Sequence, residues 1–407
     1  SVLNLKVAEG QGAITDNKDG TWTFAPSADW NGEVSFEYGI SDREVQDKTT
    51  QRPQIKLENH RTSTEFWNRS AFAALKKDGS VISWGNENTG GNNSAIDQRL
   101  NTSVKQIFSN REAFAALKND GSVFTWGNQE TGGNSTIVQN QLASNVVTIS
   151  STEKAFAALK DDGSVITWGD PQEGGNSSKV DHLIKSGVIK IYSTGYTNGK
   201  GVFAALKEDG SVVTWGDAVS GGDSSKVKGE LSSGVQELFS TQGAFAALKE
   251  NGSLVIWGNE EWGGNADEQT RQKIENNVSQ VFATQRAFAA LKKDGSVVTW
   301  GDEKYGGKSN KTGHGPDISV AKQLQDNVKQ IVSNTGVFAA LKADGSVVTW
   351  GCLSKGASMD NYRPTGIDFS SGFTKLFALS WGIAGLKANG KLVAWDSDQI
   401  GKEIDLQ

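Results

Sequence analysis

The chain has 407 residues, of which 48 are glycine, five are proline and one is cysteine. A single cysteine excludes an internal disulfide and a multi-thiolate metal site, and no apolar run is long enough to span a membrane. The formal net charge is −6, without the basic excess that nucleic-acid binding requires. We therefore expect a turn-rich protein with one large and one small domain, without nucleic acid as a partner and without direct membrane insertion.

The first fifty residues differ from the rest in charge and in pattern. They carry four Lys or Arg against nine Asp or Glu. Three short segments alternate between apolar and polar side chains, as half-buried strands do: 13–15, 21–24 and 34–38. We therefore predict a small β-sandwich-like fragment at 1–48, a polar linker at 49–61 and a separate domain at 62–407.

The N-terminal fragment carries a motif of known type, formed by Asp19–Pro26, Asp29–Gly32 and Tyr38, Ser41 and Asp42. This motif resembles the back half of the cadherin-like domains in large bacterial surface adhesins. The resemblance implies an extracellular or cell-surface location and a longer chain of which this sequence is a part.

Carboxylates in this fragment are candidate ligands for a metal ion. Calcium, a hard cation, favours such oxygens, and the candidates are Asp16, Asp19 and Asp42. The usual calcium motifs of the resembling domains are not clearly present, so solvated surface carboxylates are the alternative. No other cofactor is expected.

The rest of the chain repeats one phrase, Phe-Ala-Ala-Leu-Lys-x-Asp-Gly-Ser-Val-x-x-Trp-Gly. A degenerate eighth copy spans Ile383–Asp396, and the Trp-to-Trp steps are 42, 42, 47, 42, 43, 50 and 45 residues. A period of this length predicts a propeller or a solenoid. The seven clear copies are Phe72–Gly85, Phe114–Gly127, Phe156–Gly169, Phe203–Gly216, Phe245–Gly258, Phe288–Gly301 and Phe338–Gly351.

Each copy predicts a β-hairpin preceded by another strand. The turn is Asp-Gly in six copies and Asn-Gly in two, at 251–252 and 389–390. These dipeptides favour a type I′ turn, in which both central residues have positive φ. A small-residue strand precedes the turn and a β-branched strand follows it, and a third β-rich run lies upstream, as at 104–108. Each repeat should therefore form a sheet of three or four strands.

The repeats resemble the propeller family named for the regulator of chromosome condensation. They are most similar to its short-repeat bacterial version, which includes a secreted β-lactamase inhibitor. The shared pattern is a strand ending in Ala-Leu, then Asp-Gly, then Val-x-x-Trp-Gly-Asp/Asn, then Gly-Gly, over roughly residues 62–400. The resemblance implies an all-β, closed β-propeller, and the eight copies of the repeat suggest eight blades. Seven blades are the alternative, because the family usually has seven and the eighth copy is degenerate.

The repeated residues are interpreted as structural. Each blade of a propeller lies between two others, so the repeat tryptophans should fill the wide spaces between blades. The Gly-Gly pairs, such as Gly90-Gly91, are expected to be turn residues and not a phosphate-binding loop. The ring should be closed, because an open propeller exposes sheet edges.

Binding is expected where the repeats differ, since loops on a rigid scaffold commonly carry function. The loop before Phe-Ala-Ala-Leu varies most, and the resemblance implies that it faces a bound protein; ordinary solvated loops are the alternative. The second variable place follows Trp-Gly and includes Trp262 and Tyr305, which we assign to the competing face. These two side chains are either exposed aromatics or the cover of a blade edge. The predicted ligand-binding residues are Arg69, Arg111, Glu153, Lys154, Tyr196, Lys200, Arg286 and Trp381.

Enzyme chemistry finds little support, and we expect no catalytic activity. The sequence has no His-Glu-x-x-His, nucleophile-elbow or Walker motif. Its three histidines, His60, His182 and His314, occupy unrelated offsets in the repeat, which argues against a His-based metal site. A carbohydrate-active enzyme would need a pair of catalytic carboxylates in one pocket, and no pair stands out.

The sequence thus favours an extracellular, ligand-binding propeller of a bacterial surface adhesin. Its partner would be a protein, peptide or carbohydrate on a cell surface, as in cell adhesion or a biofilm. The competing class is a secreted protein inhibitor or a regulatory, protein-binding propeller. The adhesin-like fragment favours the first class, because a free inhibitor does not need such a fragment.

Overall fold

The structure is a computed structural model that describes residues 68–195, 201–307, 320–351, 368–378 and 382–396. Outside these ranges it places six strands, which are β1 (Val2–Val7), β2 (Gly12–Asp16), β3 (Trp22–Pro26), β4 (Phe36–Asp42), β5 (Val45–Thr49) and β29 (Lys402–Asp405).

The N-terminal strands form two antiparallel sheets, β1-β4-β5 and β2-β3. In the second sheet Gly12 pairs with Pro26 and Asp16 pairs with Trp22. The strands expected from alternation therefore correspond to β2, β3 and β4. Of the candidate calcium ligands, Asp16 ends β2 and Asp42 ends β4, whereas Asp19 lies outside the described residues. Calcium binding stays a prediction.

The eight copies of the repeat give eight antiparallel sheets in the part of the chain that is described, which we number units 1 to 8. Unit 1 has two strands, β6 (Ala71–Leu75) and β7 (Val81–Gly85). Unit 8 has four, β26 (Phe373–Ala378), β27 (Gly382–Lys387), β28 (Lys391–Asp396) and β29.

Units 2 to 7 have three strands each. Their bounds are β8 (Val104–Ser109), β9 (Ala113–Lys118) and β10 (Val123–Gly127); β11 (Val146–Ser151), β12 (Ala155–Lys160) and β13 (Val165–Gly169); β14 (Val188–Thr194), β15 (Val202–Lys207) and β16 (Val212–Gly216); β17 (Val235–Ser240), β18 (Ala244–Lys249) and β19 (Leu254–Gly258); β20 (Val278–Ala283), β21 (Ala287–Lys292) and β22 (Val297–Gly301); β23 (Val328–Ser333), β24 (Val337–Lys342) and β25 (Val347–Gly351).

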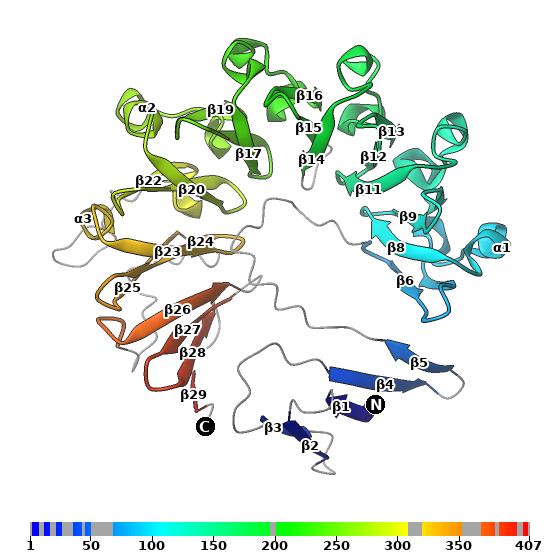
Figure 1. The fold of residues 1–407 in the computed structure, drawn as a ribbon, viewed down its shortest axis with the longest axis horizontal. Helices are drawn as coiled ribbons and strands as arrows, with labels where there is room; N and C mark the ends of the chain where they lie inside the picture. Colours follow the sequence, from blue (N-terminus) through cyan, green and yellow to red (C-terminus); the bar gives the residue numbers. More distant parts are fainter. Residues whose placement is uncertain are drawn as a thin grey trace.

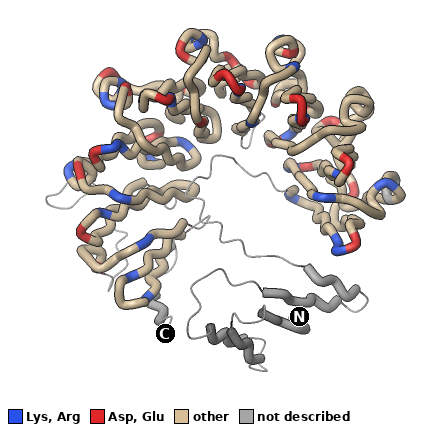
Figure 2. Tube along the Cα trace, viewed as in Figure 1, with Lys and Arg blue, Asp and Glu red and all other residues tan. Residues whose placement is uncertain are grey.

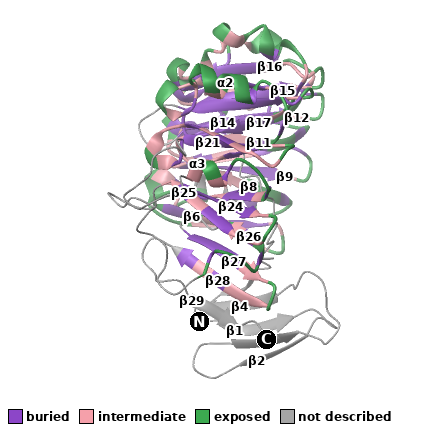
Figure 3. Ribbon diagram, turned by 90° about the vertical axis from the view of Figure 1, so that its left-hand side faces the viewer, coloured by how far each residue is buried: buried purple, intermediate pink, exposed green. Residues whose placement is uncertain are grey.

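The sheets follow one another in chain order around a common centre (Figure 1). The two strands of unit 1 correspond to the second and third strands of units 2 to 7. Three short helices lie on the outside: α1 (Asp97–Leu100), α2 (Glu268–Ile274) and α3 (Val320–Gln323). Buried residues line the strands, and exposed ones gather at the turns (Figure 3). The strands of unit 1 and unit 8 do not pair with each other, so the closed ring stays a prediction.

The Asp-Gly turns differ from the type I′ prediction. In unit 1 the Gly79 N–H donates to Lys76 O at 3.0 Å, and Gly79 has φ of 79° while Asp78 does not have positive φ. This is a three-residue loop in which a turn is followed by a left-handed glycine. Asp78 instead accepts hydrogen bonds from the backbone N–H and hydroxyl of Ser80, which lower the pKa of its carboxyl. The glycine is required, but the type I′ assignment was wrong.

Consecutive units interlock through tryptophan and glycine. Trp168 stacks on Phe156 in its own sheet, with ring centroids 5.3 Å apart, and donates from Nε1 to Gly132 O of the previous unit at 3.0 Å. Gly132 has φ of 104°, and a Cβ there would lie 2.6 Å from the Phe156 ring. The same bond joins four further pairs: Trp126 with Gly90, Trp215 with Gly174, Trp257 with Gly221, and Trp300 with Gly263.

The positive φ values confirm that the first glycine of each described pair is a turn residue. The tryptophans of units 2 to 7 are 3–5% exposed, which confirms that they are structural. Unit 1 is the exception. Phe72 is 62% exposed and Trp84 is 49% exposed, because no preceding sheet in the described part of the chain covers them. The expectation that all eight tryptophans are packed is therefore wrong for Trp84.

Candidate ligand-binding site on the inner rim

The variable loops between the first and second strands lie at the inward ends of the sheets (Figure 1), and we call this surface the inner rim. Backbone hydrogen bonds link these loops from unit to unit. Arg69 N–H donates to Arg111 O at 3.0 Å, and Arg111 N–H donates to Glu153 O at 3.1 Å. Gln242 N–H likewise donates to Gln285 O at 2.8 Å. Predicted site residues of neighbouring units are therefore held side by side.

In units 2, 3, 5 and 6 a buried Asn or Thr ties the loop to the turn that follows Trp-Gly in the same unit. Asn110 accepts from Ala113 N–H at 2.8 Å and donates to Thr131 O at 2.5 Å. Thr152 donates to Glu173 O at 2.9 Å. The same bond joins two further pairs: Thr241 with Trp262 O, and Thr284 with Tyr305 O.

These bonds correct one expectation from the sequence. The loop before Phe-Ala-Ala-Leu and the turn after Trp-Gly were assigned to competing faces. The structure places them together on the inner rim, because the buried Asn and Thr side chains bridge them. Trp262 and Tyr305 therefore belong to the same surface as Arg286.

Units 2 and 3 hold buried charges on this rim. Arg111 forms an ion pair with Glu153, whose side chain is only 2% exposed. Lys154 Nζ lies 3.9 Å from Glu173 Oε1, and the Glu173 side chain is fully buried. Burial raises the pKa of Glu173 to about 7, and neither oxygen accepts a hydrogen bond from the described residues. Glu153 and Glu173 present no surface that a ligand could contact.

Units 5 and 6 hold an aromatic cluster instead, which we call the Arg286 clamp. The Arg286 guanidinium lies over the Trp262 ring at 4.7 Å and over the Tyr305 ring at 5.1 Å. Arg286 Nη1 is 3.8 Å from Asp302 Oδ2, and the Arg286 side chain remains 37% exposed. Trp262 and Tyr305 are half-buried. The clamp thus combines a cation, a carboxylate and two aromatic rings at the surface.

The position of Arg286 is fixed by its backbone and by its neighbours. Asp302 N–H donates to Arg286 O at 2.8 Å. Gly243 holds the equivalent position in unit 5, where a Cβ would lie 2.7 Å from the Trp262 ring. Glycine therefore allows the Trp262 ring to lie flat against its own loop and to face Arg286 of the next unit.

The predicted site residues differ in accessibility. Arg69 is exposed, Arg111, Lys154 and Arg286 are partly exposed, and Glu153 is buried. The remaining three, Tyr196, Lys200 and Trp381, lie outside the described residues. Sequence reasoning missed Asp302 and Glu173. A comparison of the residue just before each Gly-Gly pair would have found Glu173, because that position is Thr, Glu, Ser, Trp or Tyr in different units.

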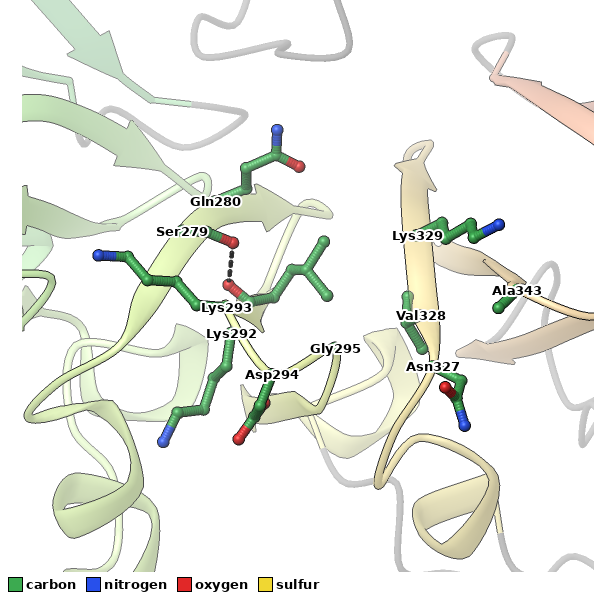
Figure 4. Close-up of a pocket in the computed structure, with 11 residues that line it drawn as sticks. Ser279, Gln280, Lys292, Lys293, Asp294, Gly295, Asn327, Val328, Lys329 and Ala343 are labelled. Atoms are coloured by element: carbon green, nitrogen blue, oxygen red, sulfur yellow. Dashed lines mark hydrogen bonds between the residues drawn. The ribbon is translucent and has the colours of Figure 1, made fainter.

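A second hollow lies away from the rim, between units 6 and 7, with a volume of about 580 Å³. It is lined by Lys292, Lys293 and Lys329, together with Asp294 and Asn327. The three lysine side chains point in different directions and do not converge on one point (Figure 4). This hollow, which we call the outer groove, is therefore the space between two neighbouring sheets. Its lysines do not form a single anion-binding site.

Within the described residues, neither the distribution of charged side chains nor the metal-ligating side chains point to a further binding site. Basic and acidic residues alternate around the sheets, and neither sign gathers on one side (Figure 2). Within the described ranges, no group of three or more His, Cys, Asp or Glu side chains could hold a metal ion. None of the described helices is long and apolar enough to cross a bilayer.

The comparison with family models matches the N-terminal part of the chain. Residues 1–56 match the family model of a cadherin-like domain. No curated protein sequence is significantly similar to the chain. The cadherin-like resemblance expected from the sequence is thus confirmed.

Solved structures similar to this chain include β-propellers. Yeast RCC1 is 17% identical, with 83% of this chain and 81% of that chain covered and a TM-score of 0.36. Human WBSCR16 is 17% identical, with 58% and 75% covered and a TM-score of 0.36. The Swd1 β-propeller domain from Myceliophteria thermophila is 13% identical, with 72% and 97% covered and a TM-score of 0.27.

Proposed function

We propose that this chain is the ligand-binding part of an extracellular bacterial surface adhesin, and that it binds its ligand through the inner rim. The observation that carries this proposal is the Arg286 clamp. Tryptophan, tyrosine and arginine are the side chains that most often dominate binding energy. Here all three meet at a partly exposed position on a rigid framework.

The clamp is preorganised, which reduces the entropy lost on binding. Arg286 is held between two rings, and its loop is bonded to the adjacent turn and to the next unit. The cadherin-like match at residues 1–56 supports a role in adhesion. The ligand in this proposal is a protein, peptide or glycan on another surface.

The proposal includes a closed ring. Units 2 to 6 each cover their Phe–Trp pair with a glycine turn of the preceding unit. In the sequence, Gly401 follows Trp395 at the same spacing as Gly90 follows Trp84. Unit 8 therefore carries the glycine needed to cover Phe72 and Trp84 of unit 1, and closure would bury two large aromatic side chains.

The test is an array of immobilised peptides, proteins and glycans probed with the full chain and with two double variants. Trp262→Ala with Tyr305→Ala changes the rim, and Lys293→Ala with Lys329→Ala changes the outer groove as a matched control. We expect the rim variant to weaken binding at least about tenfold, or roughly 1.4 kcal/mol, and the control to bind normally.

Two results would contradict the proposal. Binding that survives the rim variant and fails in the groove variant would move the site to the groove. Inhibition of one soluble protein, without attachment to any surface ligand, would favour the secreted inhibitor or regulatory propeller.

A further inference from the structure

We propose that the Arg286 clamp binds an uncharged sugar through its hydroxyl groups. This inference rests on the proposed function and names the class of ligand. It is argued from three properties of the clamp: an unused donor beside an unused acceptor, aromatic surface next to both, and a local excess of negative charge.

The donor and the acceptor are Arg286 and Asp302. Arg286 Nη1 and Asp302 Oδ2 are 3.8 Å apart, which is beyond hydrogen-bond distance. Asp302 Oδ1 accepts from Lys304 N–H at 2.9 Å, and Arg286 Nε is buried. The bonding capacity left for a third group therefore lies at Asp302 Oδ2 and at the terminal guanidinium nitrogens. A hydroxyl both donates and accepts. Sugar hydroxyls placed here would accept from the guanidinium and donate to the carboxylate.

The aromatic surface lies on both sides of this pair. Trp262 and Tyr305 flank the guanidinium and remain half-exposed. Arg286 occupies part of each ring and holds both rings in place. Trp262 also packs against Gly243, and Tyr305 packs against the buried cluster between units 6 and 7. The exposed part of each ring is therefore limited, and it can contact a C–H group of a sugar while the polar groups beside it contact the hydroxyls.

The surrounding charge disfavours an anionic ligand. The two turns that carry the rings hold Glu260, Glu261, Asp302 and Glu303, against the cations Arg286 and Lys304. Glu260 and Glu261 are exposed. Like charges across an interface cost free energy, so an acidic polysaccharide or acidic peptide fits this surface less well than a neutral glycan.

The experiment measures binding of the full chain to three neutral polysaccharides (dextran, mannan and galactan) and to acidic alginate. Arg286→Lys keeps the charge but removes the planar fork of donors, and Asp302→Asn removes the carboxylate with little change of shape. Lys293→Ala, in the outer groove between units 6 and 7 and away from the rim, is the control. Melting temperatures identify variants that fail to fold, and the conservative Asp302→Asn keeps the test informative if Arg286→Lys does not fold.

The inference predicts binding to at least one neutral polysaccharide, a loss of at least tenfold in both clamp variants, and no change in the control. Asp302→Asn separates the alternatives, because it should weaken a hydroxyl ligand and strengthen an acidic one. Binding to alginate or peptides alone, with Asp302→Asn stronger, would overturn the inference and leave the proposed function intact. Surface binding that no rim variant alters would overturn both.

Discussion

The repeated sheets and the inner rim differ in how far their side-chain contacts are the same from unit to unit. In the sheets, the same side chain does the same work in successive units, as when Trp126 and Trp168 both donate to a glycine carbonyl of the previous unit. On the rim, equivalent positions hold a buried ion pair in one place and a half-exposed aromatic clamp in another. Repetition therefore supplies stability, and variation supplies the surface that can recognise a ligand.

The largest expected effect compares one tryptophan position in two units. Trp215→Ala should destabilise the chain by about 3–5 kcal/mol, the usual result of truncating a large buried aromatic side chain. In the proposed closed ring unit 8 covers Trp84, so Trp84→Ala should destabilise by a similar amount, whereas in an open ring Trp84 stays 49% exposed and its loss should have a much smaller effect. Urea unfolding measures both. Equal losses would show that unit 8 covers unit 1 and that the ring is closed.

The next prediction concerns a rim carboxyl that acts on stability and not on binding. The pKa of Glu173 is raised to about 7 by burial. A raised pKa means that the folded state favours the protonated form, so the free energy of unfolding falls as pH rises from the usual value toward 7. Glu173→Gln should therefore be more stable than the wild type at pH 8, by up to about 3 kcal/mol.

Near pH 4 the Glu173→Gln variant and the wild type should have similar stabilities. Thermal unfolding across this pH range measures the difference, and Glu130→Gln, at an exposed position, is the control. Parallel curves for the wild type and Glu173→Gln would mean that Glu173 is solvated in solution.

A glycine substitution tests the interlock between units. Gly263 has φ of 103°, and a Cβ there would lie 2.6 Å from the Phe288 ring. Gly263→Ala should destabilise by about 2 kcal/mol through backbone strain and overpacking. Gly229 is the matched control, because nothing lies within 4 Å of its added Cβ and its φ is −63°. If Gly263→Ala and Gly229→Ala have the same free energy of unfolding, the contact between Gly263 and the Phe288 ring relaxes enough to accept a Cβ.

The smallest expected effect compares the Arg286 clamp with two predicted binding residues that lie outside the described ranges. Once a ligand is known, Tyr196→Ala with Trp381→Ala should weaken binding at least about tenfold, or roughly 1.4 kcal/mol, with folding intact. The comparison is the Trp262 and Tyr305 double variant in titration calorimetry. Loss in both variants would mean that the ligand spans the rim. Loss only in the second would confine it to the clamp.

The sequence predicted the sheets better than the site. Period and turn signals located all eight hairpins, because Asp-Gly and Asn-Gly have strong local preferences. The exposure of Trp84 could not be predicted, since its burial depends on a neighbour and not on its own phrase. The burial of Glu153 was also missed, because loops are usually solvated and this one is bonded to adjacent units. The sequence did not show that the loop before Phe-Ala-Ala-Leu and the turn after Trp-Gly lie on one surface. Their proximity depends on hydrogen bonds from the buried side chains of Thr241 and Thr284.

The most direct test of the central claim is a structure of the full chain with a ligand from the array. The account predicts that the ligand lies on the inner rim against Trp262, Arg286 and Tyr305, within hydrogen-bond distance of the guanidinium. A ligand seated instead in the outer groove between units 6 and 7, or on the N-terminal strands β1 to β5, would contradict it.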